Sequence, residues 1–121
     1  MAGVYGESVF TWHEETALAV RAVTGRGGGQ SRGPWAGLNL GAHVGDDPAA
    51  VAANRDRLAG ALGREVVYMD QCHGGDVAVV DVAPEVPPRC DGVVTTSTDL
   101  ALAVLVADCV PVLLASAEGV V

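Results

Sequence analysis

Two short motifs carry the residue types that could do chemistry in this chain of 121 residues. The first is Gln71–Gly74 (QCHG), which follows an apolar run, and the second is the pair Asp108 and Cys109. An imidazole and a thiolate together can bind a metal ion such as zinc, or they can act as a base and a nucleophile. We expect His73 and Cys109 to meet in one site.

The elements next to each motif must hold it in place. Leu100–Leu114 is an apolar segment that is interrupted by Asp108 and Cys109. Such a run, rich in Val and Leu, is typical of a buried strand that delivers polar residues at its carboxyl end. Glu65–Asp70 is predicted to be a strand that leads into the QCHG motif, and Asp76–Asp81 a strand that follows it.

The other strands are shorter and carry no obvious chemistry. Strands are predicted at Ser8–Trp12, at Ala17–Val23 and at Val93–Thr95. His13–Glu15, between the first two, is interpreted as a solvated polar turn rather than a ligand cluster. Val82–Arg89 is rich in Pro and predicts an extended surface loop.

One helix is predicted over Pro48–Leu62. Asp47 suits the N-cap, Pro48 suits the first helical position, and Gly63 suits the end. The pattern places Asn54 among the polar positions of this helix. Its apolar side is predicted to consist of Val51, Leu58 and Leu62, with Ala52 and Ala59.

The loop Thr24–Gly33 is rich in Gly and contains Arg26. Glycine lets backbone N–H groups approach an anion, and Arg offers two donors to a phosphate or carboxylate. The same composition is also typical of a mobile loop, and no Walker motif closes it. Asn39, a little further on, can cap backbone groups or contact a ligand.

The composition excludes several function classes. The formal net charge of −8 argues against a general nucleic-acid binder, which needs a basic surface. Three Cys without a CxxC spacing indicate a reducing compartment rather than a disulfide framework. No apolar run reaches the ~18 residues that a membrane span requires, so we expect a cytoplasmic protein without a membrane partner.

Four segments follow one another along the chain: TGRGGGQSRGPWAGLNLGAHVGDD, NRDRL, QCHGGDV and DGVVTTSTDLALAVLVADCVPVLLA. Taken in this order, they closely resemble the laccase-domain family, which is also called peptidoglycan editing factor, polyphenol oxidase or purine nucleoside phosphorylase. The resemblance implies an α/β fold with mixed β-sheets and flanking helices, related in shape to cysteine hydrolases. Residues 1–121 are then expected to be the N-terminal part of one such domain, truncated at its C-terminus, because Val120 and Val121 predict the opening of a further strand.

The resemblance also implies a catalytic metal site. The family's pattern builds it from the His of QxHG, the Cys of ADC and a second His in an HAGWRG motif. The first two correspond to His73 and Cys109, for which we expect zinc, with copper as the alternative. The third does not occur within the 121 residues. Cys72 and Val106 depart from the family's usual residues, but neither is one of the matched ligands.

The activity that the resemblance implies is the phosphorolysis of purine nucleosides, namely adenosine, inosine or guanosine. Deamination of adenosine and phosphorolysis of methylthioadenosine are further implied activities. Arg26 and Arg55 are then the candidates for binding phosphate, and Asn39 and Gln71 for contacting the ribose or the base. Asp108 is the nearest acid and could orient the imidazole or transfer a proton.

Three other interpretations stay open. Cys109 could be a nucleophile with His73 as its base, which predicts a hydrolase acting on cell-wall precursors. A polyphenol oxidase would need bound copper, and the chain has no clustered His-x-His pairs for a multicopper centre. The chain could also be a structural half without activity.

Overall fold

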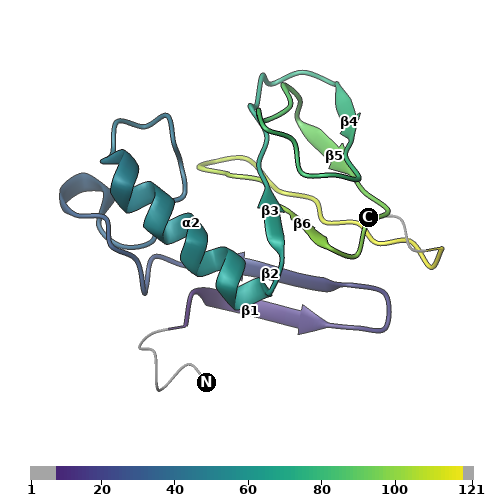
Figure 1. Cartoon of the computed structure of the whole chain (residues 1–121), viewed down its shortest axis with the longest axis horizontal. Helices are drawn as coiled ribbons and strands as arrows, with labels where there is room; N and C mark the ends of the chain where they lie inside the picture. The colour runs from purple at the N-terminus through teal and green to yellow at the C-terminus, as the bar shows by residue number, and fades with distance from the viewer. Residues whose placement is uncertain (1–7, 119–121) are drawn as a thin grey trace. The chain divides into compact units, whose positions relative to one another are not determined.

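The computed structural model describes residues 8–118, which form two compact units. The first unit comprises residues 8–16 and 20–63, and the second comprises residues 17–19 and 64–118. These residues contain one α-helix, one short 3₁₀ helix (η1, Gly33–Trp35) and six strands (Figure 1). The mixed α/β class predicted from the sequence is therefore confirmed.

The first unit begins with an antiparallel hairpin. β1 (Phe10–Glu15) pairs with β2 (Val20–Thr24), and each strand begins later in the chain than predicted. The predicted polar turn at His13–Glu15 is wrong, because these residues extend β1. Glu14 lies opposite Arg21 and forms an ion pair with it. Opposite charges that face each other across two strands stabilise the pairing, so charged residues are compatible with this exposed hairpin.

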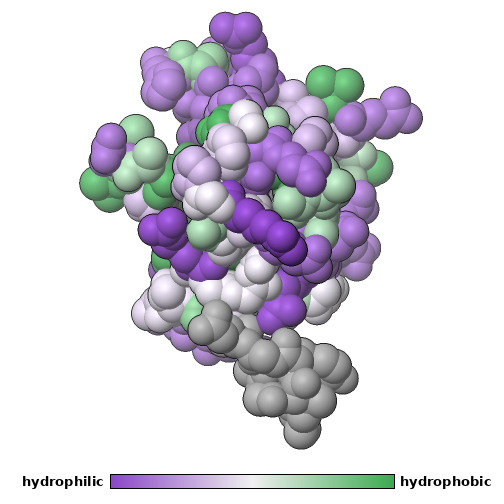
Figure 2. Space-filling model, turned by 90° about the vertical axis from the view of Figure 1, so that its left-hand side faces the viewer, coloured by the Kyte–Doolittle hydropathy of each residue, from purple (hydrophilic) through white to green (hydrophobic). Residues whose placement is uncertain are grey.

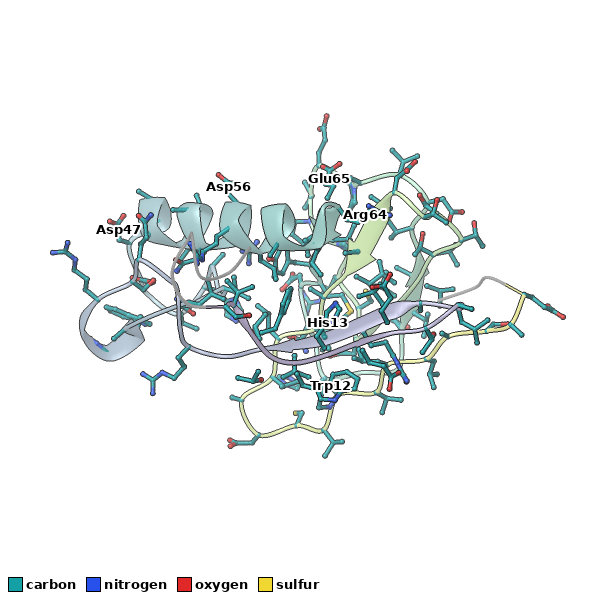
Figure 3. All side chains as sticks on the ribbon, turned by 90° about the horizontal axis from the view of Figure 1, so that it is seen from below. Trp12, His13, Asp47, Asp56, Arg64 and Glu65 are labelled. Atoms are coloured by element: carbon teal, nitrogen blue, oxygen red, sulfur yellow. The ribbon has the colours of Figure 1, made fainter. Side chains whose placement is uncertain are left out.

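The helix α2 (Pro48–Leu62) begins and ends where the sequence predicts. The Asp47 side chain accepts a hydrogen bond from the backbone N–H of Ala49 (3.0 Å), and Figure 3 shows Asp47 at this end of the helix. Gly63 ends the helix in the left-handed conformation, with φ 64°. Both ends are thus determined by residues next to them in the sequence.

The buried face of α2 differs from the predicted one. Val51 and Leu58 are buried as expected, whereas Leu62 is half-buried and Ala52 is exposed. Asn54 is fully buried, with 0% of its surface exposed. Residues 51, 54 and 58 form one stripe at helical spacing, so Asn54 lies in the apolar face and its side chain needs hydrogen-bond partners there.

The second unit contains two small parallel sheets. β3 (Glu65–Val67) pairs with β6 (Leu100–Leu102), and β4 (Val77–Val79) pairs with β5 (Gly92–Val94) (Figure 1). These strands confirm the predicted ones, but β3, β4 and β6 are shorter than predicted and β5 begins one residue earlier. The QCHG motif lies in the bend between β3 and β4, and Asp91 immediately precedes β5.

The buried strand predicted to run from Leu100 to the polar pair Asp108 and Cys109 ends at Leu102, with β6. The later apolar side chains are exposed, Val110 by 87%, Val112 by 71% and Leu114 by 73%. A continuous apolar strand is buried only where layers cover both of its faces. In the described part of the second unit, β6 pairs with β3 over three residues, and the chain then leaves the sheet.

Each unit has a small apolar core of its own. The buried hydrophobic residues of the first unit are Val9, Leu38, Leu40, Val51 and Leu58, and those of the second are Val67, Tyr68, Val80 and Cys90. Figure 2 shows that other hydrophobic side chains, in green, reach the surface between hydrophilic ones. Within residues 8–118, no helix has the length and apolarity needed to cross a lipid bilayer. The strand predicted to open at Val120 and Val121 lies outside the described residues.

Candidate functional site

Asn54 connects α2 to the glycine-rich loop of the first unit. Its side-chain oxygen accepts a hydrogen bond from the backbone N–H of Gln30 (2.7 Å). Its amide nitrogen donates to the Ser31 hydroxyl (2.9 Å) and to the Asn39 carbonyl (2.8 Å). The Asn54 side chain is shielded from water, so its polar atoms need partners within the protein, and these bonds supply them. The same bonds hold the loop against the helix.

The glycine-rich loop is packed backbone against backbone. Ser31 and Gly37 exchange two N–H···O hydrogen bonds of 3.1 and 3.0 Å, and the Leu38 N–H donates to the Arg26 carbonyl (2.8 Å). A Cβ at Gly29 would lie 2.1 Å from the Gly37 oxygen, and Gly37 itself has a φ of +103°. Glycine is therefore required at these two positions for close backbone packing. The sequence suggested either an anion-binding loop or a mobile loop, and neither interpretation includes this structural role.

The two predicted phosphate-binding residues also lie in the first unit. The Arg55 Nε donates to the Leu40 carbonyl (2.9 Å), and the Arg55 side chain lines a surface hollow with Pro48 and Val51. Arg26 is exposed at the turn of the glycine-rich loop. Arg26 thus lies on the glycine-rich loop and Arg55 on α2, the two elements that Asn54 connects. Phosphate binding by these two residues stays a prediction.

Asn39 has the capping role that the sequence left open. Its Nδ2 donates to the Asp46 carboxylate (3.0 Å) and to the Gly41 carbonyl (3.3 Å), and its Oδ1 accepts from the Gly41 N–H (3.1 Å). The Ser31 hydroxyl donates to the same Asp46 carboxylate. These hydrogen bonds, first that from Asn39 and then that from Ser31, hold the pKa of Asp46 below its usual value.

Acid is expected to destabilise this part of the first unit. Because the pKa of Asp46 is lower in the folded chain than its unperturbed value of 3.8, its bonds stabilise the fold above that pH. The stabilisation is lost as the pH falls through the folded pKa. Urea unfolding followed by circular dichroism between about pH 5 and pH 3 should show a falling midpoint, with a weaker fall in Asp46→Asn. Equal acid dependence in both proteins would contradict this.

In the second unit, the backbone of the QCHG motif converges on Asp91. The Asp91 carboxylate accepts hydrogen bonds from the N–H groups of Cys72 (3.2 Å), His73 (3.0 Å) and Gly74 (2.8 Å). The Cys72 thiol donates to it as well (3.1 Å). These donors, first the Gly74 N–H and then the Cys72 thiol, lower the pKa of Asp91 to about 2. The carboxylate is therefore ionised at neutral pH.

The remaining predicted site residues also lie in the second unit. His73 is exposed in the bend and has a φ of 57°, the sole positive φ of a non-glycine residue within residues 8–118. Gln71 is half-buried, and Asp108 and Cys109 are exposed in the segment that follows β6. The carboxylate that contacts the His73 backbone is that of Asp91. The sequence analysis missed this residue, because an Asp before a short strand equally indicates an ordinary turn.

Metal binding by His73 and Cys109 stays a prediction. Imidazole nitrogen and thiolate sulfur are donors that zinc prefers, and both side chains are exposed. Among residues 8–118, the structure shows no group of three or more His, Cys, Asp or Glu side chains that could hold a metal ion. The donor chemistry of the pair fits zinc, and the pair makes up two of the three protein ligands that a catalytic zinc ion usually has.

The three thiols are expected to differ in reactivity. Cys90 is buried, Cys109 is exposed, and the hydrogen bond to Asp91 raises the pKa of the Cys72 thiol. Alkylation requires an accessible thiolate, so iodoacetamide at about pH 8 should modify Cys109 first. Mass spectrometry of peptides after timed exposure measures the three rates. Faster modification of Cys72 than of Cys109 would contradict this order.

Comparisons with known proteins extend these observations. Residues 20–121 match the model of a family described as multi-copper polyphenol oxidoreductase laccase. The chain is 52% identical over 105 residues to a purine nucleoside phosphorylase of Corynebacterium glutamicum, and 57% identical over 106 residues to one of Streptomyces griseus. The alignments cover 82% and 83% of this chain but 43% of each relative. The chain thus spans less than half the length of the curated relatives it matches.

The fold is similar to that of a solved structure as well. The crystal structure of a Neisseria meningitidis protein matches with a TM-score of 0.77 and 36% sequence identity. The match covers 84% of this chain and 43% of that protein. Because the family model accounts for most of the chain, and the sequence motifs and the fold agree with it, the chain belongs to the multi-copper polyphenol oxidoreductase laccase family.

Proposed function

We propose that the whole protein is a metal-dependent purine nucleoside phosphorylase of the cytoplasm. It would convert adenosine, inosine or guanosine and phosphate into the free base and ribose 1-phosphate. The observation that carries the proposal is the identity of 52% and 57% to two proteins named purine nucleoside phosphorylase, over about four-fifths of this chain.

The residues suit the demands of this reaction. Phosphate attacks the ribose C1′ while the bond to the base nitrogen breaks, so the site must hold an anion and stabilise the departing base. Arg26 and Arg55 are the proposed phosphate ligands, since a guanidinium offers two parallel donors. Gln71 and Asn39 are the proposed contacts for ribose or base, and Asp108 is the proposed proton donor or acceptor.

His73 and Cys109 are the proposed ligands of a zinc ion. Their donor types and their exposure support this assignment. A bound zinc ion would supply a Lewis acid that stabilises developing negative charge. Copper is the alternative metal, because the family's description names it. Elemental analysis of the dialysed whole protein distinguishes the two metals.

The direct test is a phosphate-dependence assay on the whole protein with adenosine, inosine and guanosine. We expect equimolar free base and ribose 1-phosphate, formed at a rate that rises and saturates with phosphate. Base release that is independent of phosphate would identify a hydrolase and overturn the proposal. So would the absence of base release from all three nucleosides.

The printed family description favours a second candidate, a copper-dependent polyphenol oxidase. It predicts bound copper and oxygen-dependent oxidation of a phenolic dye. Adenosine deamination, which would release ammonia without phosphate, and phosphorolysis of methylthioadenosine are proposed as further activities of the same site. A hydrolase acting on cell-wall precursors would instead need Cys109 as a nucleophile, and alkylation of Cys109 would abolish it without metal loss.

A further inference from the structure

We propose that Asp91 is a positioning residue that sets the direction of the His73 side chain by holding the backbone of the QCHG bend. This inference rests on the proposed function, in which His73 is a metal ligand. It assigns to Asp91 a positioning role for which the sequence motifs indicate only Asp108. The evidence is the arrangement of three backbone donors, one carboxylate and one unusual backbone angle.

Consecutive backbone N–H groups of the QCHG bend converge on a single anion. The Asp91 carboxylate accepts from three residues in a row, at 3.2, 3.0 and 2.8 Å. Successive N–H groups that point inward form a concavity that binds anions, and here the protein supplies the anion itself. Hydrogen bonds to an ionised acceptor are stronger than neutral ones, so the bend has a well-defined shape.

The backbone φ of His73, 57°, lies in the left-handed region, which is uncommon for residues other than Gly, although His adopts it more often than most side chains. Such a conformation persists where surrounding contacts enforce it, and the bond from the His73 N–H to Asp91 is such a contact. The φ of His73 sets the direction of its Cα–Cβ bond. By holding this φ, the Asp91 carboxylate sets the direction in which the imidazole leaves the backbone.

The second unit contains another carboxylate that holds a turn. Asp81 holds a turn by the same chemistry, accepting from the Thr96 N–H (2.9 Å) and from the Thr95 and Thr96 hydroxyls (3.3 and 3.0 Å). That turn carries none of the proposed site residues. Asp81 is therefore a matched control, because its loss removes a loop-holding carboxylate without disturbing the bend that carries His73.

The experiment compares the whole protein with its Asp91→Asn, Asp81→Asn and His73→Ala variants. The first readout is the affinity for Zn²⁺, measured by competition with a chromophoric chelator. Partners that orient a metal ligand typically contribute 10–100-fold, so Asp91→Asn should bind Zn²⁺ about 10-fold more weakly. Asp81→Asn should stay within about 2-fold of wild type, because it does not contact the QCHG bend.

The second readout needs no metal. A residue with positive φ has its amide and α protons close together, so His73 should show a strong intraresidue NOE between them. We expect this signal to persist in Asp81→Asn and to weaken in Asp91→Asn. Wild-type NOE intensity in Asp91→Asn would overturn the inference, and so would wild-type Zn²⁺ affinity.

Two further outcomes keep the result interpretable. If Asp91→Asn fails to fold, Asp91→Glu keeps the charge and should retain part of the Zn²⁺ affinity. The inference would also be overturned if Asp91→Glu folds, loses the His73 NOE and still binds Zn²⁺ as tightly as wild type. If His73→Ala binds Zn²⁺ as tightly as wild type, the metal assignment of the proposed function fails, and the inference fails with it. A failure confined to Asp91→Asn leaves the proposed function intact.

Discussion

Replacing Asn54 by Ala is expected to lower the free energy of unfolding by about 3 kcal/mol. The substitution removes the partner of the Gln30 N–H and of the Asn39 carbonyl, which Asn54 contacts at 2.7 and 2.8 Å. A buried polar group left without a partner costs roughly 1–3 kcal/mol. The bonds to Gln30 and Asn39 are part-buried, and the bond to the buried Ser31 hydroxyl is lost as well. The glycine-rich loop would also lose its attachment to α2.

Urea unfolding followed by circular dichroism measures this effect, and Asp56→Ala is the control. Asp56 lies on the same helix but is exposed, and Figure 3 shows it on the outer side of α2. Its substitution should change the free energy of unfolding by no more than about 0.5 kcal/mol. If Asn54→Ala unfolds at the same urea concentration as Asp56→Ala, then Asn54 does not hold the loop.

Replacing His73 by Ala is expected to lower kcat/KM for inosine phosphorolysis by the whole protein at least about 100-fold. Residues that only orient a metal ligand contribute 10–100-fold, so the loss of a ligand should cost more. The same variant should also purify with less zinc. Steady-state kinetics at saturating phosphate, with elemental analysis of the same samples, measure both effects.

His13→Ala is the matched control for this experiment. His13 is an exposed histidine of β1 whose ring lies 5.6 Å from that of Phe10, and it belongs to the first unit rather than to the QCHG bend. Its loss should leave kcat/KM and zinc content within about 2-fold of wild type, as is usual for exposed residues without a special role. Turnover by His73→Ala equal to that of His13→Ala would remove His73 from the site.

The sequence by itself determined the features that depend on neighbouring residues or on motif order. Asp47 and Gly63 mark the ends of α2, because caps act on backbone groups within one turn of the helix. The order of the QCHG and ADC motifs with the glycine-rich loop indicated the family that the family model confirms. Neither inference requires knowledge of what packs against these segments.

Only the tertiary structure decided which residues are buried and which distant residues form hydrogen bonds with each other. Asn54 is a polar residue of the kind expected on the solvated side of a helix. It is nevertheless fully buried, because the loop donates a hydrogen bond to its side chain and accepts another from it. Asp91 is separated from His73 by 18 positions, so no local pattern could connect them. The apolar residues after β6 suggested burial, but they are exposed where the described unit offers no covering layer. Local sequence specifies backbone preferences, whereas burial and long-range hydrogen bonds depend on which surfaces the folded chain brings together.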